Sequence, residues 1–388
     1  MAMHSKPMPD KSIMFVAGDP SGDVHASKVV AQLRDREPET GCFGVGGPAM
    51  AAAGLEQVLP FEPFTCMGFV EVIKNLPFLL RAKRTLVQLM SSRKPSAVVL
   101  VDYAGFNIPI MKAAHRLGIP VLYYIAPKVW AWKQHRAAIL GQYASVIATI
   151  FPFEVDWFKQ YQARVEFVGN PLVEDLDARD AGEPVEHSTP KPPSIFRLAI
   201  VPGSRPQEIR NMLGPMIGAY MLLRRSYRQM RADVSRCSWL PEKLYEQAHE
   251  SSGVELFDGS LDELLAQSDV ALVTSGTATL ETALRGIPHV IAYRTSTISY
   301  RIYKRLVKTP FIGLPNIVAG EQLIPECIQD RAAPAFLAGE LEQFIGNHDH
   351  YRETVKRLRD LRGELGSKRP SEEVTRLILE LADEQKPD

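Results

Sequence analysis

Long apolar runs, an excess of charge of one sign and paired cysteines are all missing from this 388-residue sequence. No stretch of about 18 apolar residues occurs, so no segment is expected to span a bilayer. The N-terminal segment MAMHSKPMPDKS lacks the apolar core of a signal peptide, and we expect a cytoplasmic protein. The cysteines are scattered without a Cys-x-x-Cys pair, and the close pair His348 and His350 is interpreted as surface, so neither a disulfide framework nor a metal site is expected.

The charge is balanced overall but unevenly placed. Lys and Arg number 45, as do Asp and Glu, whereas a dedicated nucleic-acid-binding protein would have a basic excess. We therefore expect no nucleic-acid partner. Basic residues without any acid lie between 72 and 101 and again between 282 and 320. Two interpretations fit each cluster: a solvated helix face, or a surface for phosphates and anionic lipid head groups.

Length and hydrophobic pattern predict two α/β domains. Short runs that are apolar on both faces alternate with helical patterns, which predicts a parallel sheet covered by helices. In the first half these runs lie at 13–18, 97–102, 120–126 and 145–150. A charged, proline-rich segment without apolar periodicity follows, and the alternation then restarts. The predicted organisation is an N-terminal domain at 1–173, a linker at 174–194, a C-terminal domain at 195–345 and C-terminal helices at 346–388.

The strand ends of the first half have unusual turns. Residues 18–23, GDPSGD, run into a helix, where two glycines allow close backbone approach and the helix N-terminus favours an anion or a sugar hydroxyl; a plain tight turn is the alternative. Residues 44–49, GVGGPA, match a dinucleotide fingerprint formally, but at the wrong strand, so a glycine-rich wall of a substrate site is favoured. Asp102 closes a strand and is either a general base or the N-cap of the next helix; its position alone does not decide.

The second half contains two turns suited to a diphosphate. Residues 202–209 place Arg205 where a helix begins. In residues 274–281 a strand leads small residues into a helix N-terminus, the arrangement that phosphate binding needs, and Glu281 can accept hydrogen bonds from a ribose diol. The alternative for 274–281 is an ordinary Ser/Thr cap with a capping-box Glu. That alternative does not explain the Gly203–Arg205 turn in the same half.

Together these motifs resemble the lipid-A-disaccharide synthases, inverting glycosyltransferases with two Rossmann-like parallel-sheet domains facing a cleft (the GT-B architecture). The resemblance covers about 13–329 and rests on SGDVHAS, GVGGPAM, MGFVEV, VDYAGFN, YIAPKVWAW, FPFE, FVGNPL, GSRPQEI, SGTATLE and KTPFIGLPNIVAG. It implies transfer of 2,3-diacylglucosamine from UDP-2,3-diacylglucosamine to the 6-hydroxyl of 2,3-diacylglucosamine 1-phosphate. The products would be UDP and the β-1,6-linked lipid A precursor of Gram-negative bacteria. It implies no metal and no other cofactor, and a last helix that returns to the N-terminal domain.

The resemblance also implies roles for residues of this sequence. Inversion is one in-line displacement that needs a base and stabilisation of the departing diphosphate, and Asp102 corresponds to the base. The donor and its UDP are assigned to Gly203, Ser204, Arg205, Ser275, Gly276, Thr277, Ala278, Thr279, Glu281, Asn316 and Glu321. The acceptor side is assigned to Ser21, Gly22, Asp23 and Asn107.

Acylated substrates imply docking on a membrane, here the inner face of the cytoplasmic membrane. Residues 67–90 mix Phe, Leu and Val with a basic cluster and contain Pro77, which predicts an interfacial helix pair; the alternative is an amphipathic helix packed on the sheet. The expected membrane contacts are Phe69, Phe78, Leu79, Arg81, Lys83 and Arg84. Residues 300–308 are a second candidate contact, and a homodimer is possible.

Two departures from the family pattern stand out. Asp19 and Pro20 replace the usual Glu and small residue, and residues 230–241 are expected to form a proline-containing turn in place of an apolar strand. Other GT-B enzymes, the glycosyltransferase that makes lipid II and a UDP-sugar 2-epimerase, are competing interpretations, against which the aromatic run at 124–132 and the LPNIVAG segment argue. A catalytically silent lipid or nucleotide carrier with the same fold is the alternative from another class.

Overall fold

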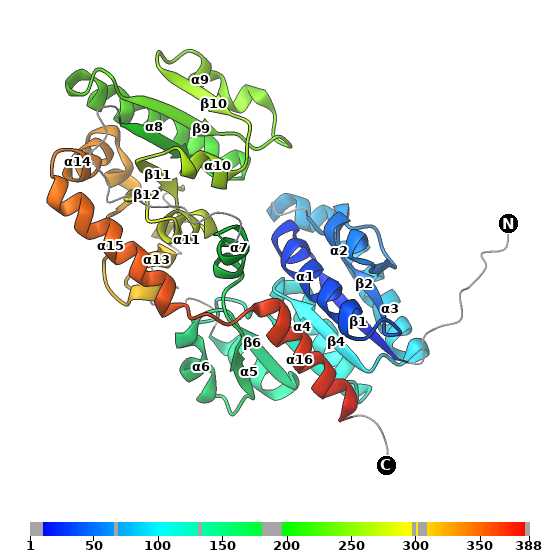
Figure 1. Ribbon diagram of the computed structural model, residues 1–388. Coiled ribbons are helices and arrows are strands. Elements are labelled where there is room, and N and C mark those ends of the chain that lie inside the picture. Colours follow the sequence, from blue (N-terminus) through cyan, green and yellow to red (C-terminus); the bar gives the residue numbers. More distant parts are fainter. Residues whose placement is uncertain are drawn as a thin grey trace. The chain divides into compact units, whose positions relative to one another are not determined.

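The computed structural model describes residues 11–65, 69–130, 134–180, 196–296, 300–301 and 309–384. The chain forms two compact units (Figure 1). The first comprises residues 1–175 and 367–388, and the second comprises residues 176–366. The C-terminal helix therefore returns to the first unit, as the sequence predicted.

The first unit is a parallel sheet covered by helices, and its strands lie in the order β3-β2-β1-β4-β5-β6-β7. Its strands are β1 (Ser12–Ala17), β2 (Gly41–Val45), β3 (Glu56–Gln57), β4 (Ala97–Val101), β5 (Val121–Tyr124), β6 (Val146–Thr149) and β7 (Val165–Phe167). Its helices are α1 (Pro20–Arg36), α2 (Pro48–Ala53), η1 (Glu62–Phe64), α3 (Phe69–Arg93), α4 (Ala104–Arg116), α5 (His135–Tyr143), α6 (Pro152–Lys159), the start of α7 (Pro171–Asp180) and α16 (Pro370–Asp383). The four strands predicted in this half are confirmed as β1, β4, β5 and β6.

Both faces of this sheet are buried, which explains the uninterrupted apolar runs. In β1, Met14 and Val16 belong to one core, whereas Ile13, Phe15 and Ala17 belong to the other. The second core also contains apolar residues of α1 and α16, and these two helices pack side by side (Figure 1). Side chains alternate across a strand, so a strand covered on both sides must be apolar at every position.

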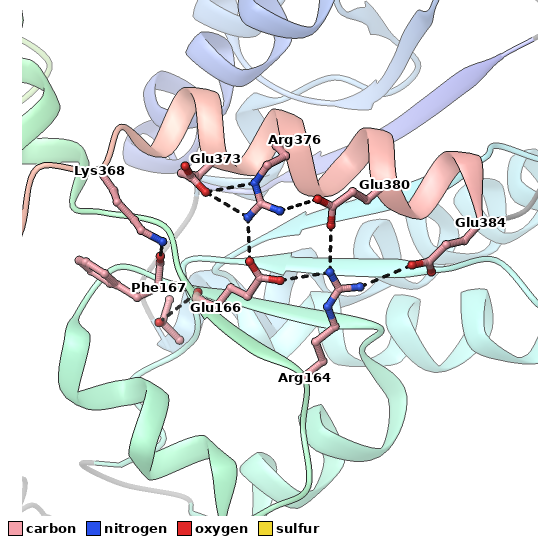
Figure 2. A network of polar contacts seen from close by, with 9 residues as sticks. Arg164, Glu166, Phe167, Lys368, Glu373, Arg376, Glu380 and Glu384 are labelled. Atoms are coloured by element: carbon pink, nitrogen blue, oxygen red, sulfur yellow. Dashed lines mark hydrogen bonds and ion pairs between the residues drawn. The ribbon is translucent and has the colours of Figure 1, made fainter.

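An ion-pair network holds α16 against β7 (Figure 2). Arg376 contacts Glu166 of β7 at 2.7 Å and also Glu373 and Glu380 of its own helix. Arg164 contacts the same Glu166 at 3.1 Å and Glu380 at 3.0 Å. Each exposed ion pair contributes little alone, about 1 kcal/mol or less, but shared partners make a network. Burial of the apolar face of α16 already determines the position of this helix on the sheet. The ion-pair network adds to the stability of that position.

The second unit is a six-stranded sheet in the order β10-β9-β8-β11-β12-β13, and every strand pairing described in either sheet is parallel. Its strands are β8 (Arg197–Val201), β9 (Arg231–Ser235), β10 (Val254–Phe257), β11 (Val270–Thr274), β12 (His289–Tyr293) and β13 (Glu326–Ile328). Its helices are α8 (Pro206–Ser226), η2 (Glu242–Tyr245), α9 (Glu246–His249), α10 (Leu261–Ala266), α11 (Thr277–Leu284), α13 (Leu314–Ala319), η3 (Gln329–Ala332), α14 (Pro334–Ile345) and α15 (His348–Glu364). The two parallel-sheet α/β units together match the predicted fold class.

The expectation that residues 230–241 lack a strand is wrong. Residues 231–235 form β9, which pairs with β8 on one side and β10 on the other. Ala232 and Val234 are buried, while Arg231 is exposed. With only two apolar side chains, the strand has too weak a pattern to stand out in the sequence, and the neighbouring strands determine it. The turn with Pro241 follows the strand and does not replace it.

Two predicted boundaries also differ from the structure. The segment predicted as a linker at 174–194 begins inside α7, and residues 181–195 lie outside the described part. Leu176 of α7 is buried despite the charged neighbours that obscured the helical pattern. In addition, the C-terminal helices do not stay together, because α15 belongs to the second unit and α16 to the first.

Candidate functional site

Asp102 lies at the carboxyl end of β4 on a strained turn. Its φ is 41° and that of Tyr103 is 45°, a left-handed conformation that costs energy for residues other than glycine. The carbonyl oxygen of Asp102 accepts hydrogen bonds from the Tyr123 hydroxyl at 2.6 Å and from Asn107 Nδ2 at 2.9 Å. The Asp102 N–H donates to the carbonyl of Tyr124 at 3.0 Å. These hydrogen bonds therefore hold the strained backbone of Asp102, and with it the carboxylate, in place.

The structure removes one of the two interpretations of Asp102. The N-cap of α4 is Tyr103, and within the described residues no side-chain hydrogen bond caps this helix. The N-cap interpretation is therefore wrong, and the role as a base stays a prediction. The strained, firmly held turn is what a functional role predicts, because such conformations cluster at active sites.

Electrostatics bring the pKa of Asp102 toward neutrality. The side chain is exposed, yet the surrounding protein replaces enough nearby water to raise the pKa of Asp102 to about 6. Desolvation is the main cause, the charge of Asp19 adds to it, and Lys128 and the Tyr103 N–H oppose it. A carboxylate with this pKa is ionised at neutral pH and can take a proton from a hydroxyl in the transition state.

Asp19 begins α1 from the end of β1, next to β4 in the sheet. Its Oδ2 accepts a hydrogen bond from the Gly22 N–H at 3.1 Å, whereas its Oδ1 is buried without a hydrogen-bond partner in the described part of the chain. Burial raises the pKa of Asp19, partly offset by the N–H groups of Gly22 and Ser21. The shorter carboxylate at this position therefore still forms a helix cap.

Two of the four residues assigned to the acceptor side have internal roles instead. The Asp23 carboxylate is buried and accepts hydrogen bonds from the backbone N–H groups of Gly47, Ala49 and Met50 at 2.7–3.0 Å. These bonds cap α2 and join the GDPSGD and GVGGPA segments. Asn107 is fully buried and donates to carbonyls at the ends of β1 and β4. The hydrogen bonds of both side chains hold turns of the protein itself and lend no support to the predicted acceptor contact, although Asn107 Oδ1 has no hydrogen-bond partner in the described part of the chain. Of the other two, Ser21 is exposed and Gly22 is buried.

In the second unit, Arg205 is the N-cap of α8, as the sequence predicted. Its side chain is 61% exposed and pairs with Glu208 at 3.2 Å. Glu208 also accepts the backbone N–H groups of Ser204 and Arg205, so the carboxylate fixes the turn. Gly203 has a φ of 116° beside it. An exposed guanidinium at a helix start can exchange this surface ion pair for a phosphate.

Among the described residues, no side-chain hydrogen bond caps the N-terminus of α11. Gly276 is the N-cap residue and makes no side-chain hydrogen bond, so the capping-box interpretation of this run is wrong. Gly276 and Thr277 are exposed, Ala278 is half-buried, and Thr279 is buried with its hydroxyl on the Gly276 carbonyl. Exposed N–H groups at such an end favour an anion. Glu281 is half-buried one turn farther along the helix.

Asn316, which was predicted to contact the donor, is buried and bonded within its own unit. It is 0% exposed and its amide is fully engaged: Nδ2 donates to the Ile324 carbonyl and to Glu326, both at 2.8 Å, and Oδ1 accepts the Ile324 N–H. Glu326 also accepts the N–H groups of Ile312 and Gly313. The pair Asn316 and Glu326 thus holds the loop before α13, and Ser275 donates to the Ile312 carbonyl of the same loop at 3.1 Å.

Glu321 lies on the surface and forms an ion pair with Arg357 of α15. Its expected contact with the donor would therefore require exchange of this partner. Asn316 is buried, whereas Glu321 lies with Gly320 on an exposed turn.

Sequence reasoning missed two charged residues, Lys128, which interacts electrostatically with Asp102, and Glu154, which interacts with Lys128. Lys128 lies in the connection after β5 as Asp102 lies in the connection after β4, which is the signal that could have identified it. Glu154 is fully buried and accepts the Trp130 indole N–H at 2.9 Å. Burial raises the pKa of Glu154 to about 7, which the bonds from Trp130 and Phe151 and the charge of Lys128 partly oppose.

The segment predicted to contact a membrane is one helix, α3, and not a helix pair, because Pro77 lies inside it. Phe78 is half-buried with its ring edge-on to Phe64, and Leu79 also packs against the core. Leu76 and Leu80 are each 50% exposed. Arg81 and Arg84 are exposed and Lys83 is half-buried, whereas the side chain of Phe69 and residues 302–308 lie outside the described part.

Within the described residues, no group of three or more His, Cys, Asp or Glu side chains lies together as a metal site would require. Among the same residues, no helix has the length and hydropathy of a membrane-spanning segment.

Solved structures with this fold include nucleotide-sugar enzymes. A UDP-GlcNAc 2-epimerase from Neisseria meningitidis bound to UDP-GlcNAc has a TM-score of 0.65 at 11% identity, covering 95% of this chain and 100% of that chain. The glycosyltransferase of kitacinnamycin has a TM-score of 0.64 at 15% identity, covering 96% and 99%. At these identities the likeness shows the fold alone.

Sequence comparisons are more specific. The model of the lipid-A-disaccharide synthetase family matches residues 13–378. The lipid-A-disaccharide synthase of Anaeromyxobacter dehalogenans is 36% identical over 91% of this chain and 93% of that protein, and that of Geobacter metallireducens is 34% identical over 96% and 98%. The relative from Pseudomonas paraeruginosa is 34% identical over 86% and 89%. The chain therefore belongs to the lipid-A-disaccharide synthase family and is a glycosyltransferase.

Proposed function

We propose that the protein transfers 2,3-diacylglucosamine from UDP-2,3-diacylglucosamine to the 6-hydroxyl of 2,3-diacylglucosamine 1-phosphate. The observation behind this proposal is Asp102, a carboxylate with a pKa near neutrality on a strained turn at the end of a parallel strand. The hydroxyl oxygen forms a bond to the anomeric carbon while the bond from that carbon to the diphosphate breaks. Asp102 accepts the hydroxyl proton, UDP leaves with the bonding electrons, and the anomeric configuration inverts.

We assign binding of the sugar-nucleotide donor to the second unit. Arg205 and the uncapped N-terminus of α11 supply positive charge for the departing diphosphate, and Glu281 lies one turn along α11 for the ribose hydroxyls. Ser275 and the pair Asn316 and Glu326 hold the loop beside this helix. These groups balance the charge of the leaving group, so we propose that no metal and no other cofactor is required.

The direct test is to incubate the purified protein with both acylated sugars in detergent and EDTA, and to detect disaccharide and UDP by mass spectrometry. Disaccharide formation would support the proposed substrates and the metal independence together. Product only after Mg²⁺ is restored would overturn the metal independence. UDP binding without transfer under either condition would favour the silent carrier.

Arg205→Ala is expected to weaken UDP binding by about 10- to 100-fold, because a hydrogen bond to a charged group contributes about 1.5–3 kcal/mol. Isothermal titration with UDP measures the change. Arg225→Ala is the matched control, since Arg225 is an exposed arginine in the last turn of the same helix. Equal UDP affinity in both variants and the parent protein would reject the role of Arg205.

We further propose that the enzyme binds the inner face of the cytoplasmic membrane through α3. Leu76 and Leu80 lie one turn apart and are exposed, with Arg81 and Arg84 exposed beside them. Apolar side chains next to cations are suited to an anionic lipid surface. The features of α3 do not bear on the homodimer, which stays a prediction.

The double variant Leu76→Glu and Leu80→Glu is expected to bind anionic vesicles about tenfold less well, because burying a leucine side chain contributes about 1.5–3 kcal/mol when complete. Vesicle flotation measures the bound fraction. Leu117→Glu is the control, because Leu117 is an exposed leucine of the same unit at the end of α4. If the vesicle-bound fraction of the double variant equals that of the control, α3 would have a purely structural role.

A further inference from the structure

Lys128 lies between two carboxylates because of the strand order. In the sheet, β5 is flanked by β4 and β6. Asp102 directly follows β4, Lys128 follows β5, and Glu154 lies in the first turn of α6, which follows β6. Because these strands are parallel, their carboxyl ends meet at one edge of the sheet. Three charged residues from three successive connections are therefore neighbours there.

The described part of the loop, residues 125–130, is anchored on both sides of Lys128. Before it, Ile125 has a φ of 57° and its N–H donates to the Ala148 carbonyl of β6 at 3.2 Å. After it, the buried Trp130 donates to the fully buried Glu154 at 2.9 Å. A non-glycine residue in the left-handed region persists only where its surroundings determine it. Residues on both sides of Lys128 are thus anchored, Ile125 to β6 and Trp130 to α6.

The charges around Lys128 are mutually consistent. Although Lys128 is exposed, the surrounding protein displaces enough nearby water to lower the pKa of its ammonium, and the negative charges of Asp102 and Glu154 oppose this decrease. In return, Lys128 opposes the rise in the pKa of both carboxyl groups. Asp102 is also close enough to Asp19 for the two negative charges to repel each other. Asp102 therefore has one acidic neighbour on the β1–α1 turn and one cation on the β5–α5 loop.

We propose that Lys128 is a positioning residue for the transfer reaction, held by the Trp130–Glu154 contact so that its ammonium offsets Asp19 and keeps Asp102 ionised. This inference rests on the proposed role of Asp102 as the base. A base must be unprotonated before the acceptor hydroxyl arrives, and a nearby carboxylate alone would favour its protonated form. The ammonium of Lys128 supplies the compensating charge without touching the reacting atoms.

The test compares the pH dependence of turnover in the parent protein, Lys128→Met and Lys128→Arg. Removal of the cation is expected to move the midpoint of the acidic limb to higher pH by about one pH unit, the lower end of the effect of an opposite charge within a few ångströms. Lys128→Arg keeps the charge and is expected to keep the midpoint. Among the residues that the structure describes, the charged groups that act on Asp102 or its contacts are Asp19, Lys128 and Arg136, the last through Tyr123.

A second measurement does not depend on turnover. The carboxyl C=O band of Asp102 is followed in infrared pH-difference spectra of the full-length protein and assigned by its loss in Asp102→Asn. It is expected to titrate at higher pH in Lys128→Met than in the parent protein. If the parent protein makes no disaccharide, the proposed function fails while this titration still decides the role of Lys128. Lys128→Gln serves where the Met variant is poorly folded, since the Lys128 side chain is exposed and glutamine is polar.

An unchanged midpoint and an unchanged infrared titration in Lys128→Met would overturn the proposal. A variant that only raises KM for the acceptor, with the midpoint unchanged, would also overturn it, because Lys128 would then bind the acceptor phosphate directly. A shifted midpoint that Lys128→Arg restores supports the proposal.

Discussion

Asp102→Asn is expected to lower turnover by about 100- to 10,000-fold, the usual contribution of a general base, while UDP binding is unchanged. Asparagine has the same shape but does not accept a proton at neutral pH. The fold should persist, because the hydrogen bonds that hold this turn go to the backbone of Asp102, and asparagine tolerates a φ of 41° well. Kinetics with the two acylated sugars and titration with UDP measure the two quantities.

The parent protein should show a matching pH dependence. Only ionised Asp102 accepts a proton, so turnover should fall about tenfold per pH unit below a pKa of about 6 and level off above it. The residual turnover of Asp102→Asn should lack this acidic limb. Asp156→Asn is the matched control, because it removes an exposed carboxylate of the same unit and keeps both Asp102 and its neighbour Asp19. Near-normal turnover of Asp102→Asn would remove Asp102 as the base.

Asn316→Asp is expected to destabilise the second unit by about 3–5 kcal/mol, the cost of breaking a buried polar contact that leaves charge uncompensated. The new carboxylate would lie against Glu326 and face the Ile324 carbonyl, to which Asn316 Nδ2 now donates at 2.8 Å. Two carboxyl groups side by side cannot both ionise cheaply, so the loss should grow as pH rises. Denaturant unfolding at several pH values measures it.

The same substitution separates the structural role of Asn316 from donor binding. If Asn316 contacted the donor, UDP affinity would fall while the free energy of unfolding stayed unchanged. Asn347→Asp is the matched control, because Asn347 caps α15 through its side-chain oxygen, a position where aspartate serves equally well. Equal stability of the two variants would contradict the network described around Glu326.

Much of the fold could be predicted because the sequence pattern of several strands agrees with their burial in the sheet. The strands β1, β4, β5 and β6 are buried on both faces, so their sequences stand out as apolar at every position except the terminal Ser12 and Thr149. By contrast, β9 has only Ala232 and Val234 as buried apolar residues, and its two neighbouring strands determine it. Tertiary pairing overrides a weak local pattern there.

For the candidate site, the sequence by itself determined where polar residues end strands and begin helices. That was sufficient to single out Asp102, Arg205 and the start of α11, since position along a parallel strand predicts the edge of the sheet. It did not determine where each side chain is directed. Asp23, Asn107 and Asn316 have the same polar chemistry as ligand-binding residues, yet their hydrogen bonds go to other turns and strand ends of the protein itself. Only the tertiary structure brings those groups together, and only it places Lys128 between Asp102 and Glu154, because strand order is a property of the whole sheet and not of any segment.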